Sequence, residues 1–203
     1  MNKMKKGTIL MSIGLLLLSA ALFLTIYNIT DEKRAGKMAD TVLSELQEEV
    51  QTDSEDKDDT EKLKDYQKYP EMEMPTKEID GRYYIGILEI PVIGIELPVN
   101  DEWDDESARS APCRYAGSVY SKDIVIAGHN YSTHFAKLEQ LSYDDKIFFT
   151  DVEGNRFEYQ VVGIEVLDGT DVEEMQTGDW DMTLFTCTYS GQTRLTIRCE
   201  LID

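Results

Sequence analysis

The sequence predicts a mostly β body, built as a barrel or a sandwich, that follows a single membrane-spanning helix. Two observations lead to this fold class. Between residues 83 and 201, short apolar runs recur at close spacing with turn residues between them, and no long helical patterns alternate with them. Near the N-terminus, an uncharged run at 7–30 is dominated by Leu, Ile, Ala and Phe. At about 1.5 Å per residue, that run is long enough to cross a bilayer core of roughly 30 Å.

The apolar run is expected to remain as a membrane anchor. A cleavable signal peptide has an apolar core of only about 7–15 residues, and the one weak cleavage-like site, at 19–21, lies inside the run. Lysines precede the run, whereas Lys33 and Arg34 follow it. Because the positive-inside rule counts lysine and arginine, we expect a single-pass protein of the cell membrane with a cytoplasmic N-terminus and an extracellular body.

The residues after the anchor, 31–80, are expected to form an acidic stalk. Four apolar residues recur there at helical spacing and predict one amphipathic helix: Met38, Val42, Leu46 and Val50. Between 45 and 61, nine acids accompany Lys57 as the only base, which is typical of a solvated spacer. Residues 51–80 contain few apolar groups, so the predicted organisation is an anchor at 1–30, a stalk at 31–80 and a folded body at 81–203.

The composition argues against nucleic acid as a partner, and it does not decide whether any of the cysteines form a disulfide. The formal net charge is −20 and no basic stripe is present, which argues against nucleic acid. Three cysteines, Cys113, Cys187 and Cys199, cannot all pair, so at least one thiol is free. A Cys113–Cys199 disulfide and two buried free thiols both remain compatible with the sequence.

The elements of the body follow in order along the chain. "YYIGILEIPVIGIELPV" (83–99) predicts two short strands, separated at Pro91 and Gly94, and "DIVIAG" (123–128) predicts a short buried strand. Two hairpins are predicted by "KIFFTDVEGNRFEYQVVGIEVL" (146–167) and "DMTLFTCTYSGQTRLTIRCEL" (181–201). Short helical breaks fit 104–111 and 134–142.

The last hairpin places a thiol opposite a guanidinium. If Ser190 and Gly191 form a two-residue turn, Cys187 pairs directly with Arg194. Directly opposed residues share one face of a sheet, with Cβ atoms about 4.5–5.5 Å apart. A fixed positive charge there favours the thiolate, which is the nucleophile, and can hold an oxyanion as an acyl group transfers.

A thiol nucleophile usually works with an imidazole, and the sequence contains two histidines. His129 directly follows the strand at 123–128, between Gly128 and Asn130. A strand end that opens into a loop is where rigid scaffolds place reacting groups, so His129 is the preferred candidate. We expect His134, at the start of a short helix, to be a hydrogen-bonded structural residue.

These residues together resemble the sortases, the membrane-anchored cysteine transpeptidases of Gram-positive bacteria. "IAGHN" (126–130) looks like the strand that carries the family's histidine, and "TLFTC" (183–187) looks like its TLxTC strand. "TRLTIRCEL" (193–201) is similar to its R-L-x-V-R strand, and "LEIPVIGIELPV" (88–99) resembles its first core strands. The resemblance covers 85–201 and keeps the family's order of histidine, cysteine and arginine.

The resemblance implies a closed eight-stranded β-barrel with short helices, and a transpeptidase mechanism. Cys187 would attack the threonine carbonyl of an LPxTG-like sorting signal, break the threonine–glycine bond and form a thioacyl enzyme. An amine of a cell-wall precursor or of a pilin would then resolve it. His129 would be the acid/base group, and Arg194 would hold the sorting signal and the oxyanion, with Arg198 as the rival for that role. The remaining expected substrate-binding residues are Leu184, Thr186, Asn130 and Arg198.

Several features limit what the resemblance implies. The sequence contains one apolar run, and "DEW" (101–103) has no proline and is not expected to be a lid, so a subclass other than the C-terminally anchored pilin class is expected. The acids are too scattered to assign a calcium site, and we assign no metal and no cofactor. The expected partners are surface proteins or pilins that carry sorting signals. Two alternatives remain open: a thiol peptidase that releases its product to water, and a non-catalytic anchored β-domain.

Overall fold

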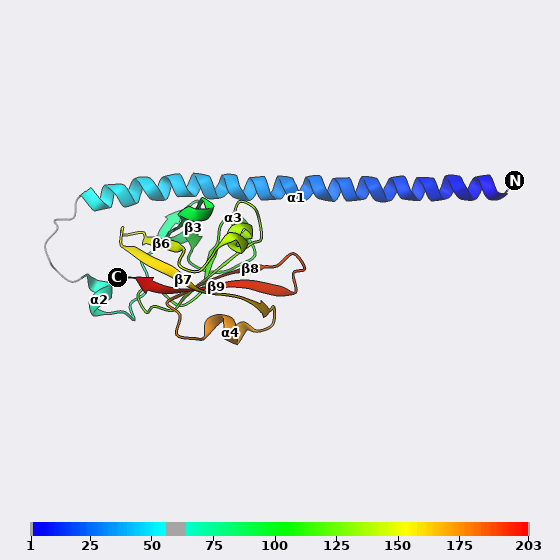
Figure 1. Cartoon of the computed structure of the whole chain (residues 1–203). Helices are drawn as coiled ribbons and strands as arrows, with labels where there is room; N and C mark the ends of the chain where they lie inside the picture. Colours follow the sequence, from blue (N-terminus) through cyan, green and yellow to red (C-terminus); the bar gives the residue numbers. More distant parts are fainter. Residues whose placement is uncertain (1, 56–63, 203) are drawn as a thin grey trace. The chain divides into compact units, whose positions relative to one another are not determined.

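The structure is a computed structural model that describes residues 2–55 and 64–202 (Figure 1). The chain divides into two compact units, Met1–Arg34 and Ala35–Asp203, and helix α1 (Asn2–Glu55) contributes to both. Within α1, the apolar side chains of residues 9–29 are largely exposed. By length and composition, α1 is the one helix in the described residues that could cross a membrane.

The second unit is mostly β, with short helical segments in its connections. Its strands are β1 (Lys77–Ile79), β2 (Arg82–Ile90), β3 (Ile95–Asn100), β4 (Cys113–Ala116), β5 (Ile124–Gly128), β6 (Lys146–Asp151), β7 (Arg156–Asp168), β8 (Met182–Cys187) and β9 (Thr193–Ile202). Its short helices are α2 (Asp65–Lys68), η1 (Pro91–Ile93), α3 (Ser107–Ser110), η2 (Ala136–Gln140) and α4 (Val172–Gln176).

The strands close into a barrel. In the described chain, the sheet order is β1-β2-β3-β4-β5-β8-β9-β7-β6, and β6 also pairs with β2, which closes a ring of eight strands from β2 to β9. Strand β1 lies outside this ring and pairs with the first residues of β2, from Arg82 to Tyr84. The β3–β4 and β5–β8 pairs are parallel and the other pairs are antiparallel. The predicted mostly β fold is confirmed as the barrel rather than the sandwich.

The barrel interior holds the main hydrophobic core. Inward positions alternate along each strand, as the two-residue period of a strand requires. Ile126 of β5, Leu184 of β8 and Ile197 of β9 are fully buried in one cluster with Phe149 and Tyr159. Burying this set on one face of each strand fixes the register of the strands, because a slip of one residue would turn every inward side chain outward.

From Ala35 onward, the described residues of the segment predicted as a stalk cluster in one compact unit with the barrel. The compact unit begins at Ala35, and the buried face of α1 consists of Ala35, Ala39, Val42 and Leu46, whereas Met38 is exposed. The predicted helix is therefore present with a slightly rotated apolar face. The part of the predicted linker at 56–63 lies outside the described residues.

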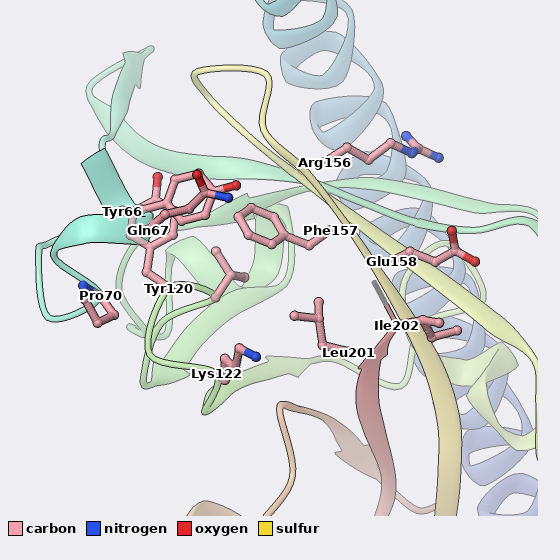
Figure 2. A pocket seen from close by; sticks show the side chains of 11 residues that line it. Tyr66, Gln67, Pro70, Tyr120, Lys122, Arg156, Phe157, Glu158, Leu201 and Ile202 are labelled. Carbon is pink, nitrogen blue, oxygen red and sulfur yellow. The ribbon is translucent and has the colours of Figure 1, made fainter. Parts of the chain in front are cut away.

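Helix α2 is held on the barrel by aromatic stacking beside a pocket of about 430 Å³ (Figure 2). The Tyr66 ring stacks on Tyr120 with centroids 4.8 Å apart, and Phe157 lies 5.4 Å from Tyr66. The Tyr120 hydroxyl in turn donates to the fully buried carboxylate of Asp151 over 2.7 Å. A few buried aromatic groups thus bring α2 into the fold, although its sequence is mostly polar.

Candidate functional site

The three predicted catalytic residues lie on, or directly after, neighbouring strands of the barrel. Strands β5, β8 and β9 are adjacent in that order, and the last paired residues of β5 and β8 are Gly128 and Thr186. His129 and Cys187 each follow these residues directly. Neighbouring strands are about 4.8 Å apart, so His129 and Cys187 occupy adjacent positions. Cys187 is paired with Arg194 on its other side, which completes a row across the sheet.

This row faces the outside of the barrel. The residues of β5 and β8 that alternate with the inner ones, Val125, Ala127 and Phe185, pack in a separate outer cluster. By the two-residue period of a strand, His129 and Cys187 share this outer face. Cys187, His129 and Arg194 are all half-buried, so a substrate chain laid across the strand ends can reach each of them.

The predicted pairing of Cys187 with Arg194 is confirmed, although the turn is longer than expected. The Thr188 amide donates to the Thr193 carbonyl over 3.0 Å, and the Gly191 amide donates to the Thr188 carbonyl over 2.8 Å. Gly191 has φ +71°, a left-handed conformation that favours glycine. Residues 189–192 therefore form the loop, and because its centre is the predicted one, the register is unchanged.

The guanidinium of Arg194 rests against the backbone of this turn. It donates to the carbonyls of Gly191 over 3.0 Å and Thr193 over 3.1 Å. Gly169 leaves room for it, since a Cβ there would lie 3.1 Å from Arg194 Nη1 and 2.6 Å from the Gln192 carbonyl. Both accepting carbonyls belong to residues at the surface of the hairpin, so the guanidinium can exchange them for a ligand oxygen by a side-chain rotation.

His129 lies among aromatic rings. The Tyr131 ring centroid is 5.0 Å from the imidazole, and the Trp103 centroid is 6.2 Å from it. Trp103 also meets Tyr115, which in turn packs edge-on against Phe185 of the outer face. The sequence predicts no role for Trp103. The one signal in the sequence was a large aromatic residue inside an otherwise acidic loop.

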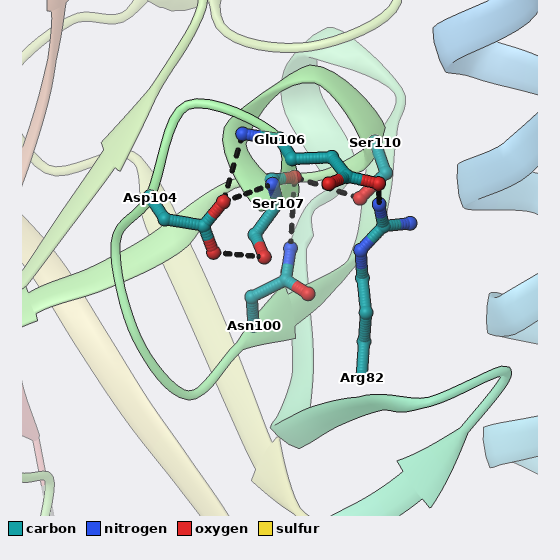
Figure 3. A network of polar contacts seen from close by, with 6 residues as sticks. All are labelled: Arg82, Asn100, Asp104, Glu106, Ser107 and Ser110. Atoms are coloured by element: carbon teal, nitrogen blue, oxygen red, sulfur yellow. Dashed lines mark hydrogen bonds and ion pairs between the residues drawn. The ribbon is translucent and has the colours of Figure 1, made fainter.

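The loop that carries Trp103 is fixed by a polar network (Figure 3). Asp104 accepts hydrogen bonds from the amides of Glu106 and Ser107 and from the Ser107 hydroxyl, which starts α3. These hydrogen bonds hold the pKa of the Asp104 carboxyl below its usual range. The buried Asn100 amide donates to the Ser107 carbonyl, and Arg82 pairs with Glu106 over 2.8 Å. These hydrogen bonds fix the loop that carries Trp103, and the side chains of Trp103 and His129 take no part in them.

A pocket of about 210 Å³ opens beside the thiol. Its lining includes Asn130 and Thr186, two of the predicted substrate-binding residues, together with Cys187, Tyr189 and Leu195. The Thr186 hydroxyl is buried and donates to the Gly128 carbonyl over 2.8 Å, which ties the ends of β5 and β8 together. Leu184 has no exposed surface and belongs to the barrel core. A side chain in the barrel interior lies away from the outer face that carries Cys187, so the placement of Leu184 does not favour the predicted substrate contact.

Arg198 is buried and occupied by protein partners. Its guanidinium donates to the Glu165 carboxylate, the Thr183 hydroxyl and the carbonyls of Glu174 and Met175, over 2.5–3.1 Å. Only 3% of the residue is exposed. Arg198 therefore clamps α4 onto the outer face of β8 and β9, which supports a structural role more than the catalytic or substrate-binding roles that the sequence left open.

The other two cysteines are free thiols in the core. Cys113 and Cys199 are fully buried and unpaired with one another, so the disulfide alternative is wrong. Burial raises the pKa of Cys113 to about 12 and raises that of Cys199 above its usual range. Cys187 is thus the one partly exposed cysteine. Among the described residues, no group of three or more His, Cys, Asp or Glu side chains is placed to hold a metal ion.

Comparisons with known proteins agree with this arrangement. The family model described as "Sortase domain" matches residues 88–202. Sortase A of Bacillus anthracis is 30% identical over 121 residues, which cover 57% of each protein. Sortase D of Bacillus subtilis is 29% identical over 107 residues, or 50% of this chain and 53% of that protein. The chain thus spans little more than half the length of these two relatives.

Solved structures show the same fold. Sortase A from Corynebacterium diphtheriae has a TM-score of 0.55 at 26% identity, over 60% of this chain and 62% of that one. A structure of a Clostridium perfringens Sortase D5 transpeptidase has a TM-score of 0.60 over 82% of this chain and 99% of that one. At 20% identity, the second likeness concerns the fold alone.

Proposed function

The chain belongs to the sortase family, and we propose that it is a membrane-associated cysteine transpeptidase that cleaves an LPxTG-like sorting signal and transfers the released acyl group to an amine. The observation that carries the proposal is the row formed by His129, Cys187 and Arg194 on the outer face of three adjacent strands. A thiol, an imidazole and a guanidinium are the groups that acyl transfer through a thioester needs.

The first half of the reaction forms the thioacyl enzyme. The Cys187 thiolate attacks the threonine carbonyl carbon, a carbon–sulfur bond forms, and the carbonyl oxygen becomes an oxyanion that the Arg194 guanidinium stabilises. The bond from threonine to the glycine nitrogen then breaks. The protonated imidazole of His129 gives its proton to that leaving amine, so the glycine fragment departs neutral.

The second half transfers the acyl group. An incoming amine attacks the thioester carbonyl, His129 accepts its proton, and the carbon–sulfur bond breaks to regenerate the thiolate. The candidate acceptors are an amine of a cell-wall precursor or a lysine of a pilin. The donors would be surface proteins or pilins that carry the sorting signal. We infer that residues 7–30 anchor the protein as a single-pass span, with the N-terminus cytoplasmic and the barrel unit outside the cell.

The decisive test is product analysis by mass spectrometry. Full-length protein in detergent is incubated with an LPxTG-like peptide, with and without an oligoglycine or a diaminopimelate-type amine. The proposal predicts a new amide between the threonine and the added amine. Hydrolysis alone, at the same rate with amine present, would identify a thiol peptidase. An inert peptide together with an unreactive Cys187 would identify a non-catalytic binding domain.

The two arginines should respond differently to substitution. We expect Arg194→Ala to lower kcat/KM by about 10²–10³, because it removes the donor nearest the oxyanion, and we expect Arg194→Lys to restore little because lysine lacks the forked geometry. Arg198→Ala should instead cost about 3 kcal/mol in the free energy of unfolding, measured in urea, since it leaves buried acceptors unpaired. A greater rate loss for Arg198→Ala in protein that remains folded would reverse the two assignments.

A further inference from the structure

The part of α1 that follows the apolar run packs into the barrel unit along a stripe of apolar residues. Ala35, Ala39, Val42 and Leu46 recur at helical spacing, and each is at most 7% exposed. Ala39 belongs to the main core cluster, whereas Val42 and Leu46 pack with Ile79, Tyr84 and Ile87. The larger residues thus anchor the helix near β1 and β2, and the small ones lie toward the end that follows the apolar run.

At that end, the helix touches the loop that follows His129. A Cβ built on Gly36 would lie 2.8 Å from Thr133 Cγ2, which is closer than real Cβ atoms approach, and 3.1 Å from Thr133 Cβ, which is tighter than most real contacts. Glycine is disfavoured inside helices, so its presence here is explained by this close approach. Gly14, in the same helix, has nothing within 4 Å of such a Cβ, so a methyl group there would meet no neighbour.

The loop is compact enough to pass a displacement at Thr133 to the imidazole. The Phe135 amide donates to the His129 carbonyl over 3.1 Å, and the amides of His134 and Ala136 both donate to the Tyr131 carbonyl. Phe135 is fully buried against Gly128, where a Cβ would lie 2.6 Å from its ring. The Tyr131 ring then contacts the His129 ring.

We propose that the part of α1 that follows the apolar run, through the contact of Gly36 with Thr133, is a positioning element that sets the orientation of the His129 imidazole. The inference rests on the proposed function insofar as His129 is taken to be the acid/base group. Proton transfer depends on the imidazole lying within hydrogen-bond reach of the reacting nitrogen, so a small shift of the loop slows turnover.

The test compares Gly36→Ala with Gly14→Ala in the full-length chain in detergent micelles. Both changes place the same methyl group in the same helix, and alanine favours a helix more than glycine does. Gly36→Ala is expected to lower kcat by about tenfold with KM within about twofold, since a misplacement of about 1 Å can cost up to 10²-fold. Gly14→Ala should leave both constants unchanged.

A matched rescue isolates the contact. Thr133→Ser removes the Cγ2 methyl and keeps the hydroxyl, so the Gly36→Ala/Thr133→Ser double variant should recover most of the lost kcat, while Thr133→Ser alone has a small effect. A readout independent of activity is the NMR titration of the two histidines in the sequence, with His129 assigned from a His129→Gln variant. The His129 signal and its pKa should shift in Gly36→Ala and return toward the wild-type values in the double variant.

The outcomes separate the two proposals. Wild-type kcat in Gly36→Ala, or a fall in kcat with an unchanged His129 signal, would overturn the positioning role. A wild-type protein that transfers no peptide would count against the proposed function, and the NMR arm would still decide whether the helix positions His129. A shifted His129 signal that the double variant restores supports positioning in either case.

Discussion

Replacing Cys187 with alanine is expected to abolish both cleavage and transfer of a sorting-signal peptide, with kcat/KM reduced by roughly 10⁴-fold or more. In the proposed mechanism Cys187 is the nucleophile, so the substitution removes the covalent path altogether, and neither the imidazole nor the guanidinium can replace the thiol. The side chain is small, half-buried and at the end of β8, so its loss should leave the barrel folded. Peptide turnover followed by chromatography, with the unfolding transition measured in parallel, provides the test.

The two buried cysteines supply the control for this experiment. Cys113 and Cys199 are fully buried, and burial raises the pKa of both thiols, so neither can act as a substitute nucleophile near neutral pH. Iodoacetamide at neutral pH should modify the folded wild-type chain at one cysteine and the Cys187→Ala variant at none. Cys113→Ala and Cys199→Ala should keep most of the activity. Continued turnover by Cys187→Ala would show that the nucleophile lies elsewhere.

The geometry of the last hairpin could be predicted because it depends on local spacing. Cys187 and Arg194 lie symmetrically about the centre of the turn, and any hairpin with that centre pairs them. The loop length was predicted less well, because Gly191 adopts a left-handed conformation that ends a turn begun at Thr188. Since the wider loop keeps the same centre, that error left the predicted site unchanged.

The docking of α1 could not be read from the sequence. The acidic run after residue 45 has the composition of a solvated spacer. Its many charged residues lower the average hydrophobicity of the segment, so the few apolar residues in it do not stand out. The buried face depends on Ala35 and Ala39, which bury little area each and mark no strong periodicity. Their contribution arises from close approach to the barrel, which is a property of the tertiary structure.

The contacts of Arg198 and Trp103 could not be predicted from the sequence either, because their partners are distant along the chain. The partners of Arg198 at Glu165 and Met175 lie 33 and 23 residues away in the sequence. Trp103 and His129 are separated in the sequence by a similar number of residues. Their rings meet because Trp103 lies in a loop whose conformation depends on the hydrogen bonds of Asp104. Spacing rules describe neighbours along a strand or helix, and they give no information about which distant loops fold over a site.

Replacing His129 with alanine is expected to lower kcat/KM by about 10²–10⁴, the usual contribution of general acid–base catalysis. The loss should be smaller than for Cys187→Ala, because the thiol and Arg194 remain and water can still exchange protons slowly with the leaving amine. The limb of the pH–rate profile that reports the imidazole should disappear in the variant.

His134→Gln is the matched control for this imidazole. His134 has no exposed surface and meets Tyr131 with ring centroids 5.5 Å apart, so it packs within the loop that follows His129 and is closed to a substrate at the surface. We therefore expect His134→Gln to lower the unfolding temperature more than it lowers kcat, and to leave the pH–rate profile with both limbs. A larger rate loss at His134 than at His129, in protein that is still folded, would transfer the acid/base role to His134. Such a result would contradict the position of His129 beside Cys187, which follows from the pairing of Gly128 with Thr186 and from the alternation along β5.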